Sequence, residues 1–201
     1  RADLTNVFRM SEAMLVMKAD MCRVFSEIGM PSFPLQEASL LYVNEGGRVA
    51  VHAAPLLHAL GLGQLPVLSG GFVFDADRGV RPLNGDLLVQ ALIDVDGLQV
   101  ERALFLSGED GLLDARGETV PRLGRDDRTT AQRLVRRSGT DGIDVTGGMS
   151  SKLDCCFDIA EQGVDARILA GANLSRDALG DALLGQSGRG TVFTPSRTVH
   201  A

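Results

Sequence analysis

The sequence has 201 residues, of which 44% are hydrophobic and 23% are charged, and its formal net charge is −6. This balance is typical of a folded globular protein and argues against an intrinsically disordered chain. The acidic net charge gives no reason to expect nucleic acid or an anionic membrane as a partner. No apolar run approaches the roughly 20 residues of a membrane-spanning helix, so we expect no membrane partner either.

The cysteines and histidines indicate neither a disulfide framework nor a metal site. The three cysteines are Cys22, Cys155 and Cys156, an odd number that includes an adjacent pair. Such a set favours free thiols in a reducing, cytoplasmic environment. The sequence has no CxxC motif, and its three histidines lack the spacing of metal ligands. We therefore expect no metal held by a dedicated set of protein side chains.

Hydrophobic periodicity predicts short strands that alternate with helices. Residues 4–28 carry apolar side chains at three- and four-residue steps, which predicts a helix that ends at Gly29. These apolar side chains are Val7, Met10, Met14, Met17, Met21 and Phe25. The elements expected next are apolar segments at 38–43 and 48–53, a helical run at 54–63, a strand at 65–68, a hairpin turning near Arg78-Gly79 and a helix opened by Asn84-Gly85-Asp86.

The second half of the chain continues this alternation. The expected elements are a strand at 100–107, an amphipathic helix within 114–143, a helix from Met149, a strand at 166–170, a helix at 176–185 and a strand at 190–194. Short, apolar strands between helices predict an α/β fold with an open, mostly parallel sheet that is covered on both faces. Ligands of such sheets bind beyond the carboxyl ends of the strands, where the loops 69–71, 84–86 and 107–111 are expected.

The segment DVTGGMSSKLD, residues 144–154, is typical of a phosphate site at a helix start. The apolar spacing after it places the beginning of the helix near Gly148. Unpaired N–H groups and the helix dipole favour an anion there, and glycine lets phosphate oxygens approach the backbone. Lys152, one turn into the helix, would add a positive charge. The alternative is an ordinary helix start, with Asp144 or Thr146 as the N-cap and Lys152 in solvent.

Two aspartates allow the same pair of interpretations. Asp86 follows a glycine at the start of an apolar helix, where a carboxylate is favourable in the first turn. It could instead orient lysines or magnesium around a phosphoryl group. Asp110 precedes a glycine in the segment LSGEDG, which is also common in ordinary turns.

The order of these segments resembles the amino acid kinase superfamily. PVLSGG, NGD, FLSGEDG, DVTGGMSSK and a final GT follow one another along the chain. Within the superfamily they are most similar to the branch that contains isopentenyl phosphate kinase and the fosfomycin-resistance kinase. The resemblance covers essentially the whole sequence, which we therefore interpret as one domain, residues 1–201.

The resemblance implies a three-layer αβα sandwich that transfers the γ-phosphoryl group of ATP, bound with Mg²⁺, to a small phosphate or phosphonate. Lys152 and Asp86 correspond to residues that act on the transferring group. The nucleotide would lie against Ser107, Asp110, Gly111, Gly147, Gly148 and Lys152. The acceptor would lie against Gly70, Gly71 and Gly85. The first helix, residues 5–28, corresponds to one that often packs across a homodimer interface, although a core face explains its methionines equally well.

Three departures from the family pattern favour an alternative function. Gly108 and Gly71 stand where the family usually has aspartates, and the lysine- and glycine-rich segment that precedes the first helix in the family is not in this sequence. The alternative is a non-catalytic member that binds nucleotide or another anion as a sensor or partner subunit. The residues leave open whether an acceptor would resemble isopentenyl phosphate or fosfomycin.

Overall fold

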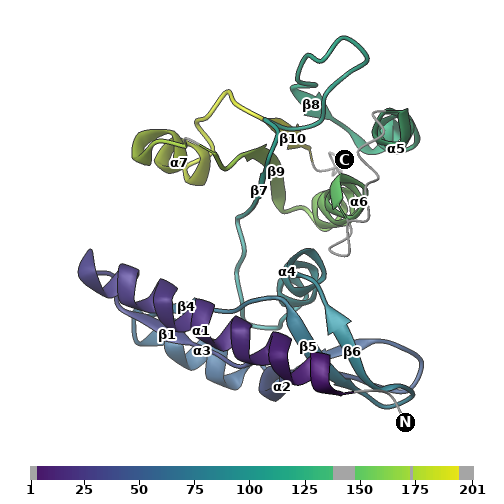
Figure 1. Cartoon of the computed structure of the whole chain (residues 1–201). Coiled ribbons are helices and arrows are strands. Elements are labelled where there is room, and N and C mark those ends of the chain that lie inside the picture. Colours follow the sequence, from purple (N-terminus) through teal and green to yellow (C-terminus); the bar gives the residue numbers. More distant parts are fainter. Residues whose placement is uncertain (1–3, 138–147, 173, 195–201) are drawn as a thin grey trace, which may run out of the picture. The chain divides into compact units, whose positions relative to one another are not determined.

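The computed structural model describes residues 4–137, 148–172 and 174–194. The contacts divide the chain into two compact units, Arg1–Leu98 and Gln99–Ala201 (Figure 1). Of the helices in the described residues, none combines the length and the hydrophobicity needed to cross a membrane.

The first unit contains two sheets and four helices within its described residues. Its elements are α1 (Thr5–Glu27), β1 (Ser32–Pro34), α2 (Glu37–Leu40), β2 (Leu41–Val43), β3 (Val49–Val51), α3 (Ala54–Gly61), β4 (Leu65–Val67), β5 (Gly71–Asp75), β6 (Gly79–Leu83) and α4 (Gly85–Ile93). β1 pairs with β4 in parallel, and the other sheet has the order β3-β2-β5-β6. α1 packs against β1, β4 and β5, and α4 packs against β3.

The core of the first unit lies between its four-stranded sheet and its helices. Its buried side chains are Leu35, Leu40, Leu41, Val43, Leu56, Val73, Leu83 and Leu88. The predicted hairpin is confirmed, because β5 and β6 pair antiparallel around a turn in which Gly79 has a φ of 76°. A positive φ at this position requires glycine or a residue that tolerates the left-handed region.

The second unit contains one four-stranded sheet with helices on either side of it (Figure 1). Its elements are β7 (Arg102–Ser107), β8 (Arg122–Leu123), the 3₁₀ helix η1 (Arg125–Asp127), α5 (Arg128–Arg137), α6 (Gly148–Glu161), β9 (Asp165–Ala170), α7 (Arg176–Leu183) and β10 (Thr191–Phe193). The sheet has the order β7-β9-β10-β8, and β7 and β9 pair in parallel. α6 packs on the sheet and α5 packs on α6.

The core of the second unit forms where α6 meets the sheet. Leu153, Phe157 and Ile159 of α6 are buried, as is Ile168 of β9. The ring of Phe157 meets that of Phe193 edge to face, with 5.0 Å between centroids and an interplanar angle of 89°. Such aromatic pairs stabilise a core beyond the area that they bury. Cys155 and Cys156 are buried on the same helix, and neither is part of a disulfide in the described residues.

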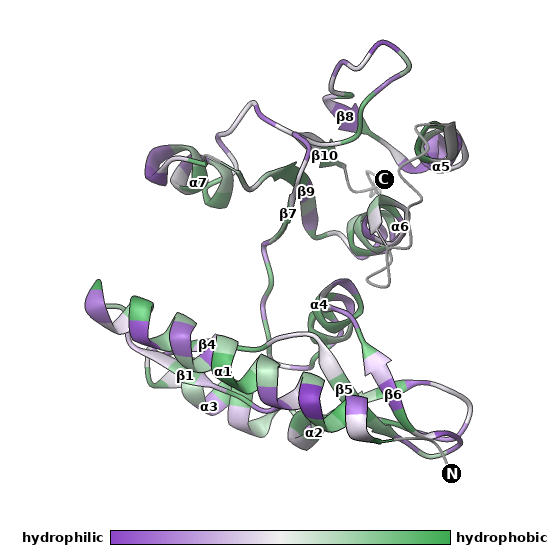
Figure 2. Cartoon of the chain, in the orientation of Figure 1, coloured by the Kyte–Doolittle hydropathy of each residue, from purple (hydrophilic) through white to green (hydrophobic). Residues whose placement is uncertain are grey.

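The methionine stripe of the first helix is only partly covered by the rest of the first unit. Met10, Met17 and Met21 are each about 40% exposed, whereas the one buried residue of α1, a helix described in full, is Lys18. Figure 2 shows hydrophobic and hydrophilic residues interspersed along this helix. Val7, Met14 and Phe25 of the same stripe are half-buried, so the stripe is a partly covered face and both interpretations of it stay open.

The predicted α/β class is confirmed. Between the named strands, four pairings are parallel and three are antiparallel, and the sheets are open. The structure adds β1 and β8, which the periodicity did not indicate, and the apolar segment 38–43 begins as the helical turn α2 before it extends into β2. The other expected helices and strands occur within a few residues of their expected bounds.

Candidate functional site

The carboxyl ends of β7 and β9 lie side by side at one edge of the sheet in the second unit. Their parallel register pairs Ser107 with Ala170, the last residue of each strand. Asp110, in the loop after β7, joins the two ends, because its Oδ1 accepts a hydrogen bond of 3.1 Å from the N–H of Ala170. Its Oδ2 lies 3.6 Å from Nε of Arg189. The predicted loop 107–111 thus lies where an open α/β sheet carries its ligands.

Gly111 is explained by close packing within this edge. Its φ is 98°, and a Cβ at this position would lie 2.4 Å from Oγ1 of Thr191. The Thr191 hydroxyl is completely buried, accepts a hydrogen bond from the Leu112 N–H at 2.8 Å and donates one to the Val120 carbonyl at 2.7 Å. A side chain at position 111 would disturb this arrangement, so the loop after β7 needs a glycine there.

The N-terminus of α6 lies at the same edge of the sheet. α6 begins at Gly148, as the apolar spacing predicted, and only Gln162–Val164 separate it from β9, on which it packs. A 14-residue helix is about 21 Å long. A six-residue strand is about 20 Å long. Running back along β9, α6 therefore brings its first turn to the level of Ala170.

Lys152 is the fifth residue of α6 and is half-buried. Gly148 has a φ of 53°, a backbone conformation that glycine adopts without strain. Gly147, and the alternative N-caps Asp144 and Thr146, lie outside the described residues. Of the residues that would distinguish an ordinary capped helix start from a phosphate site, the structure thus describes Gly148 and Lys152.

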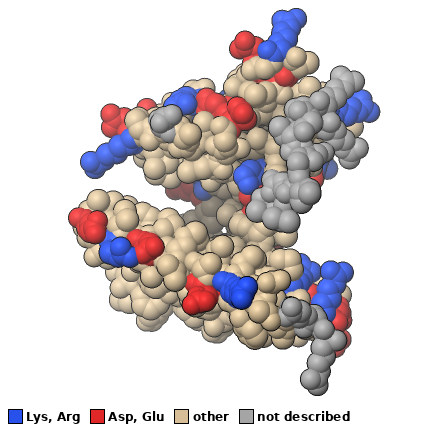
Figure 3. All heavy atoms as spheres, viewed as in Figure 1, with Lys and Arg blue, Asp and Glu red and all other residues tan. Residues whose placement is uncertain are grey.

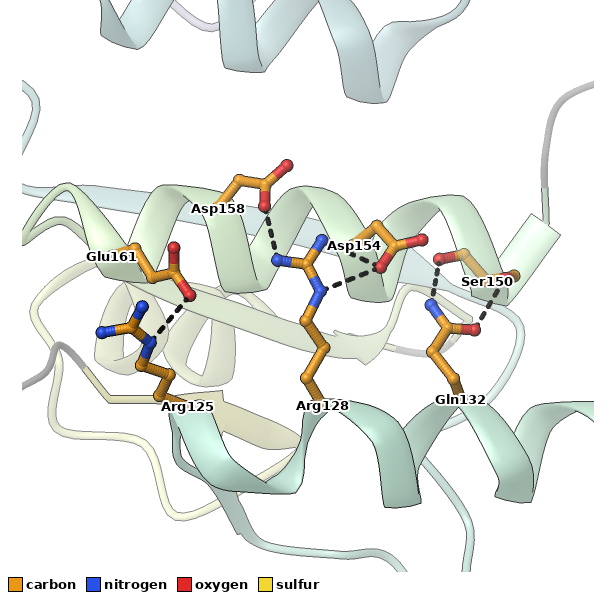
Figure 4. Close-up of polar contacts among 7 residues, drawn as sticks. All are labelled: Arg125, Arg128, Gln132, Ser150, Asp154, Asp158 and Glu161. Atoms are coloured by element: carbon orange, nitrogen blue, oxygen red, sulfur yellow. Dashed lines mark hydrogen bonds and ion pairs between the residues drawn. The ribbon is translucent and has the colours of Figure 1, made fainter.

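α5 holds the side of α6 through a row of polar contacts (Figure 4). The guanidinium of Arg128 donates to Asp158 at 2.7 Å and to Asp154 at 3.0 and 3.2 Å. It also lies 5.7 Å from the centroid of the Phe157 ring, within the range of a cation–π contact. Nearer the start of α6, Gln132 donates to the Ser150 carbonyl at 3.2 Å and accepts from its hydroxyl at 2.8 Å.

The two aspartates stabilise the charged form of Arg128. Partial burial lowers the pKa of its guanidinium, but the hydrogen bonds and negative charges of Asp158 and Asp154 outweigh burial, so that its pKa is raised above the ordinary value. Arg128 is therefore a permanent cation that fixes the acidic side of α6 to α5.

In the first unit, two of the predicted loops meet. Gly70, which follows β4, packs against the turn before α4, because a Cβ on it would lie 3.0 Å from the Leu83 carbonyl and 3.3 Å from the Gly85 nitrogen. Gly71 then begins β5 and pairs with Leu83 of β6. The structure thus brings together Gly70, Gly71 and Gly85, the residues expected to line an acceptor.

Asn84, not Asp86, caps α4. The Asn84 side chain accepts a hydrogen bond of 2.8 Å from the Leu87 N–H, as an N-cap does. Asp86 lies in the first turn and is 7% exposed. Asp86 is thus a first-turn carboxylate, as the ordinary helix-start interpretation expects, and both interpretations of this residue stay open. Its carboxylate is also a buried acidic group beside the turn that receives Gly70.

The periodicity gave no sign of a further pair of residues beside the loop 69–71. Glu37 accepts hydrogen bonds from the backbone N–H and the hydroxyl of Ser69, and it forms an ion pair with Lys18. Lys18, Glu37 and Ser69 are all buried. The local signal that could have indicated this cluster is the position of Lys18, which lies four residues after Met14 and so falls on the apolar stripe of the helix.

The charged side chains of the visible surface are of both signs. On the face that Figure 3 shows, basic and acidic side chains are interspersed. Within the described ranges, no group of three or more histidine, cysteine, aspartate or glutamate side chains is arranged to hold a metal ion.

Comparison with known proteins decides the family. The model of the amino acid kinase family matches residues 2–170, which extend across both units. The chain belongs to the amino acid kinase family.

Curated members of the family with detectable similarity include archaeal and bacterial kinases. The chain is 28% identical over 151 residues to an isopentenyl phosphate kinase of Haloferax volcanii, covering 75% of this chain and 58% of that protein. It is 29% identical over 186 residues to an isopentenyl phosphate kinase of Methanothermobacter thermautotrophicus, covering 89% of this chain and 66% of that protein. An acetylglutamate kinase of Granulibacter bethesdensis is 29% identical over 129 residues, covering 64% of this chain and 39% of that protein.

Solved structures share the fold. An isopentenyl phosphate kinase aligns with a TM-score of 0.68 and 22% identity, over 89% of this chain and 65% of the other. An isopentenyl phosphate kinase of T. acidophilum aligns with a TM-score of 0.57 and 18% identity, over 90% of this chain and 66% of the other. The chain thus spans less than two thirds of the length of these family members.

Proposed function

We propose that this amino acid kinase family protein transfers the γ-phosphoryl group of MgATP to a small acceptor that carries a phosphate or phosphonate. One geometric argument supports the proposal: Asp110 joins the ends of β7 and β9, and the length of α6, which packs on β9, is enough to bring Gly148 and Lys152 to the same edge of that sheet. Similarity to isopentenyl phosphate kinases over 75% and 89% of the chain supports the acceptor class.

In this proposal the second unit binds the nucleotide. N–H groups at the start of α6 would receive phosphate oxygens, because a helix N-terminus favours an anion and Gly148 has no side chain to obstruct it. Lys152 would neutralise the charge that develops on the transferring group. Ser107, Asp110 and Gly111, at the ends of the strands, would form the adjoining wall of the nucleotide pocket, with Gly147 beside the phosphates.

The first unit would bind the acceptor. Gly70, Gly71 and Gly85 converge at the turn before α4, where a backbone without side chains can approach a phosphate or phosphonate closely. Asp86, buried beside this turn, would orient the groups that act on the transferring phosphoryl. Catalysis would then consist of positioning and charge neutralisation.

Magnesium would arrive as part of the donor substrate. Mg²⁺ keeps several waters and is commonly held by substrate phosphates with one or two carboxylates, so it does not need a cluster of protein ligands. The described residues fit this mode, because they place single carboxylates such as Asp110 near the proposed site.

A second candidate function is nucleotide or anion binding without catalysis. The observation that favours it concerns Gly71 and Gly108, where a Cβ would meet nothing within 4 Å and the φ angles are not in the left-handed region. At the level of the Cβ atom, neither position therefore requires glycine. The loss of both carboxylates removes charges that would act on magnesium or the phosphates in a catalytic member, which favours binding without catalysis.

We also propose a homodimer formed through α1 and a location in the cytoplasm. Phe8, Val16 and Val24 of α1 are more than half exposed, which leaves an apolar surface of the kind that an interface covers. The three cysteines, none of which is in a disulfide within the described residues, are compatible with a reducing compartment.

Phosphorus NMR of the full-length gene product tests the proposed reaction. MgATP would be offered with isopentenyl phosphate, with fosfomycin and with N-acetylglutamate in separate samples. A new phosphoanhydride signal with either of the first two, formed in step with ADP, would establish the kinase and name its acceptor. A product from N-acetylglutamate alone would overturn the acceptor class. ATP binding without any product would favour the non-catalytic function.

A further inference from the structure

Lys18 is a charged residue in the interior of the first unit. It is 1% exposed, although it lies on a helix whose apolar side chains are largely in solvent. Its Nζ lies 2.7 and 3.0 Å from the two carboxylate oxygens of Glu37, 2.9 Å from the Leu35 carbonyl and 3.1 Å from Oε1 of Gln36. An ammonium group has three N–H donors, and here all of its neighbours are acceptors.

Glu37 connects Lys18 to the loop after β4. The carboxylate is 3% exposed and accepts hydrogen bonds from the Ser69 backbone N–H and, at 3.2 Å, from the Ser69 hydroxyl. The Ser69 N–H thus has a charged acceptor 32 residues away in the sequence. Hydrogen bonds of this kind are stronger than those between neutral groups.

The anchored residue is directly followed by the glycines of the proposed acceptor site. Gly70 comes next and packs against the Leu83 carbonyl and the Gly85 nitrogen, and Gly71 begins β5. A shift of Ser69 would therefore move the backbone that faces the start of α4. The contacts form a continuous path from α1 through Glu37 to the turn that precedes Asp86.

We propose that the buried Lys18–Glu37 ion pair positions the Ser69–Gly71 loop, and through it the acceptor side of the phosphotransferase site. The proposal rests on the proposed function for its catalytic consequence. Lys18 and Glu37 are positioning residues, because they act through the Ser69 backbone and do not touch the acceptor.

The choice of lysine fits this role. The sequence has 20 basic residues, and Lys18 and Lys152 are the two lysines among them. A chain that otherwise uses arginine has a compact ammonium where four acceptor atoms converge on one point. The planar guanidinium of arginine could not occupy such a space without displacing them.

Two double variants separate positioning from stability. Lys18→Met with Glu37→Leu replaces the buried pair by apolar side chains of similar size, a change that is often neutral for folding, but it leaves the Ser69 N–H without its acceptor. Lys18→Met with Glu37→Gln also removes both charges, yet the amide oxygen can still accept from Ser69. The second variant is thus a matched control for the first.

Steady-state kinetics of the full-length gene product provide the decisive comparison. In the leucine variant, Lys18→Met with Glu37→Leu, we expect kcat/KM for the acceptor to fall by about 100-fold. A displacement of about 1 Å in a reacting group can have an effect of this size. The KM for ATP should be unchanged. The glutamine variant, Lys18→Met with Glu37→Gln, should have a kcat/KM for the acceptor close to that of the wild type. Wild-type acceptor kinetics in the leucine variant, or an equal loss in both variants, would overturn the proposal.

Hydrogen exchange at the Ser69 amide keeps this test independent of the proposed reaction. If the wild-type protein phosphorylates no acceptor, the proposed function fails, whereas the anchoring can still be measured. We expect faster exchange of this amide in the leucine variant than in the glutamine variant. Equal exchange rates in the two would overturn the positioning role.

Discussion

Gly111 and Thr191 are in such close contact that a methyl group on Gly111 would lie 2.4 Å from the Thr191 hydroxyl oxygen and 2.6 Å from its backbone nitrogen. The two residues join the loop after β7 to the beginning of β10. The same hydroxyl is bonded to Leu112 and Val120, so it cannot move aside without breaking buried hydrogen bonds. The loop that carries Asp110 is therefore fixed by a steric constraint as well as by the bond to Ala170.

Gly111→Ala should destabilise the protein by at least about 2 kcal/mol, because it combines a side chain in the left-handed region with an overpacked contact. Urea denaturation would measure the change. Gly108→Ala, three residues earlier, is the matched control, because its new methyl group would meet nothing within 4 Å. It should change the free energy of unfolding by no more than about 0.5 kcal/mol. Equal effects of the two substitutions would contradict the packing that the structure shows.

Arg128 bridges α5 to two aspartates of α6, and its removal should loosen the helix that carries Lys152. Because the three side chains are about a third to a half exposed, solvent weakens each pair. We expect Arg128→Ala to lower the free energy of unfolding by about 1 kcal/mol. The measurement is thermal or urea denaturation at low and high salt, and the loss should shrink as salt screens the wild-type pairs.

Arg125→Ala serves as the control for this prediction. Arg125 lies 3.5 Å from Glu161 of the same helix α6, but its side chain is 69% exposed. Its removal should cost less than about 0.5 kcal/mol. If Arg125→Ala lowered the free energy of unfolding more than Arg128→Ala, the contacts of Arg128 drawn in Figure 4 would not be the stronger link between α5 and α6.

Lys152→Ala should lower turnover by about 10²- to 10³-fold if Lys152 stabilises the transferring phosphoryl group. Because the side chain is only half-buried near the end of a helix, the fold should survive, and circular dichroism would verify this. Lys152→Arg keeps the charge but changes its shape, and should retain more activity than the alanine variant. Unchanged turnover in Lys152→Ala would remove Lys152 from the proposed mechanism.

Asp75 should make the stability of the first unit depend on pH in the acid range. Burial raises the pKa of its carboxyl, but the backbone N–H groups of Arg78 and Asp77 and the charge of Arg81 outweigh burial, so the pKa lies below its ordinary value. The carboxylate accepts from both N–H groups at 2.9 Å. Its stabilising effect is therefore fully present above the pKa of the unfolded chain, about 4, and is lost as the pH falls through the lower folded value.

Asp75→Asn should be less stable than the wild type at pH 6, and the difference should narrow as the pH falls below about 4. Urea denaturation across this range would measure it. Asp77→Asn is a suitable control, since Asp77 contributes its backbone N–H to this turn. A constant difference between wild type and Asp75→Asn at all pH values would contradict the prediction.

The order of elements and several parts of the candidate site were predictable from local patterns. The hairpin at Arg78-Gly79, the start of α6 at Gly148 and the polar opening of α4 at Asn84 each depend on residues within a few positions of one another. Turn, cap and helix signals act over such distances, so the sequence is enough to locate them. β1 escaped detection because Pro31 precedes it, Pro34 ends it and it has no apolar run, and β8 because it has two residues, too few for a periodic pattern.

Tertiary structure alone decided which side chains of α1 are buried. The periodicity placed methionines on one face, yet Lys18 is the residue that enters the interior, because its acceptors come from residues 17 to 19 positions later in the chain. The contact of Gly70 with Gly85 and that of Gly111 with Thr191 likewise join distant segments. A buried charge is stable only where its partners converge, and that convergence is a property of the folded chain that no local pattern contains.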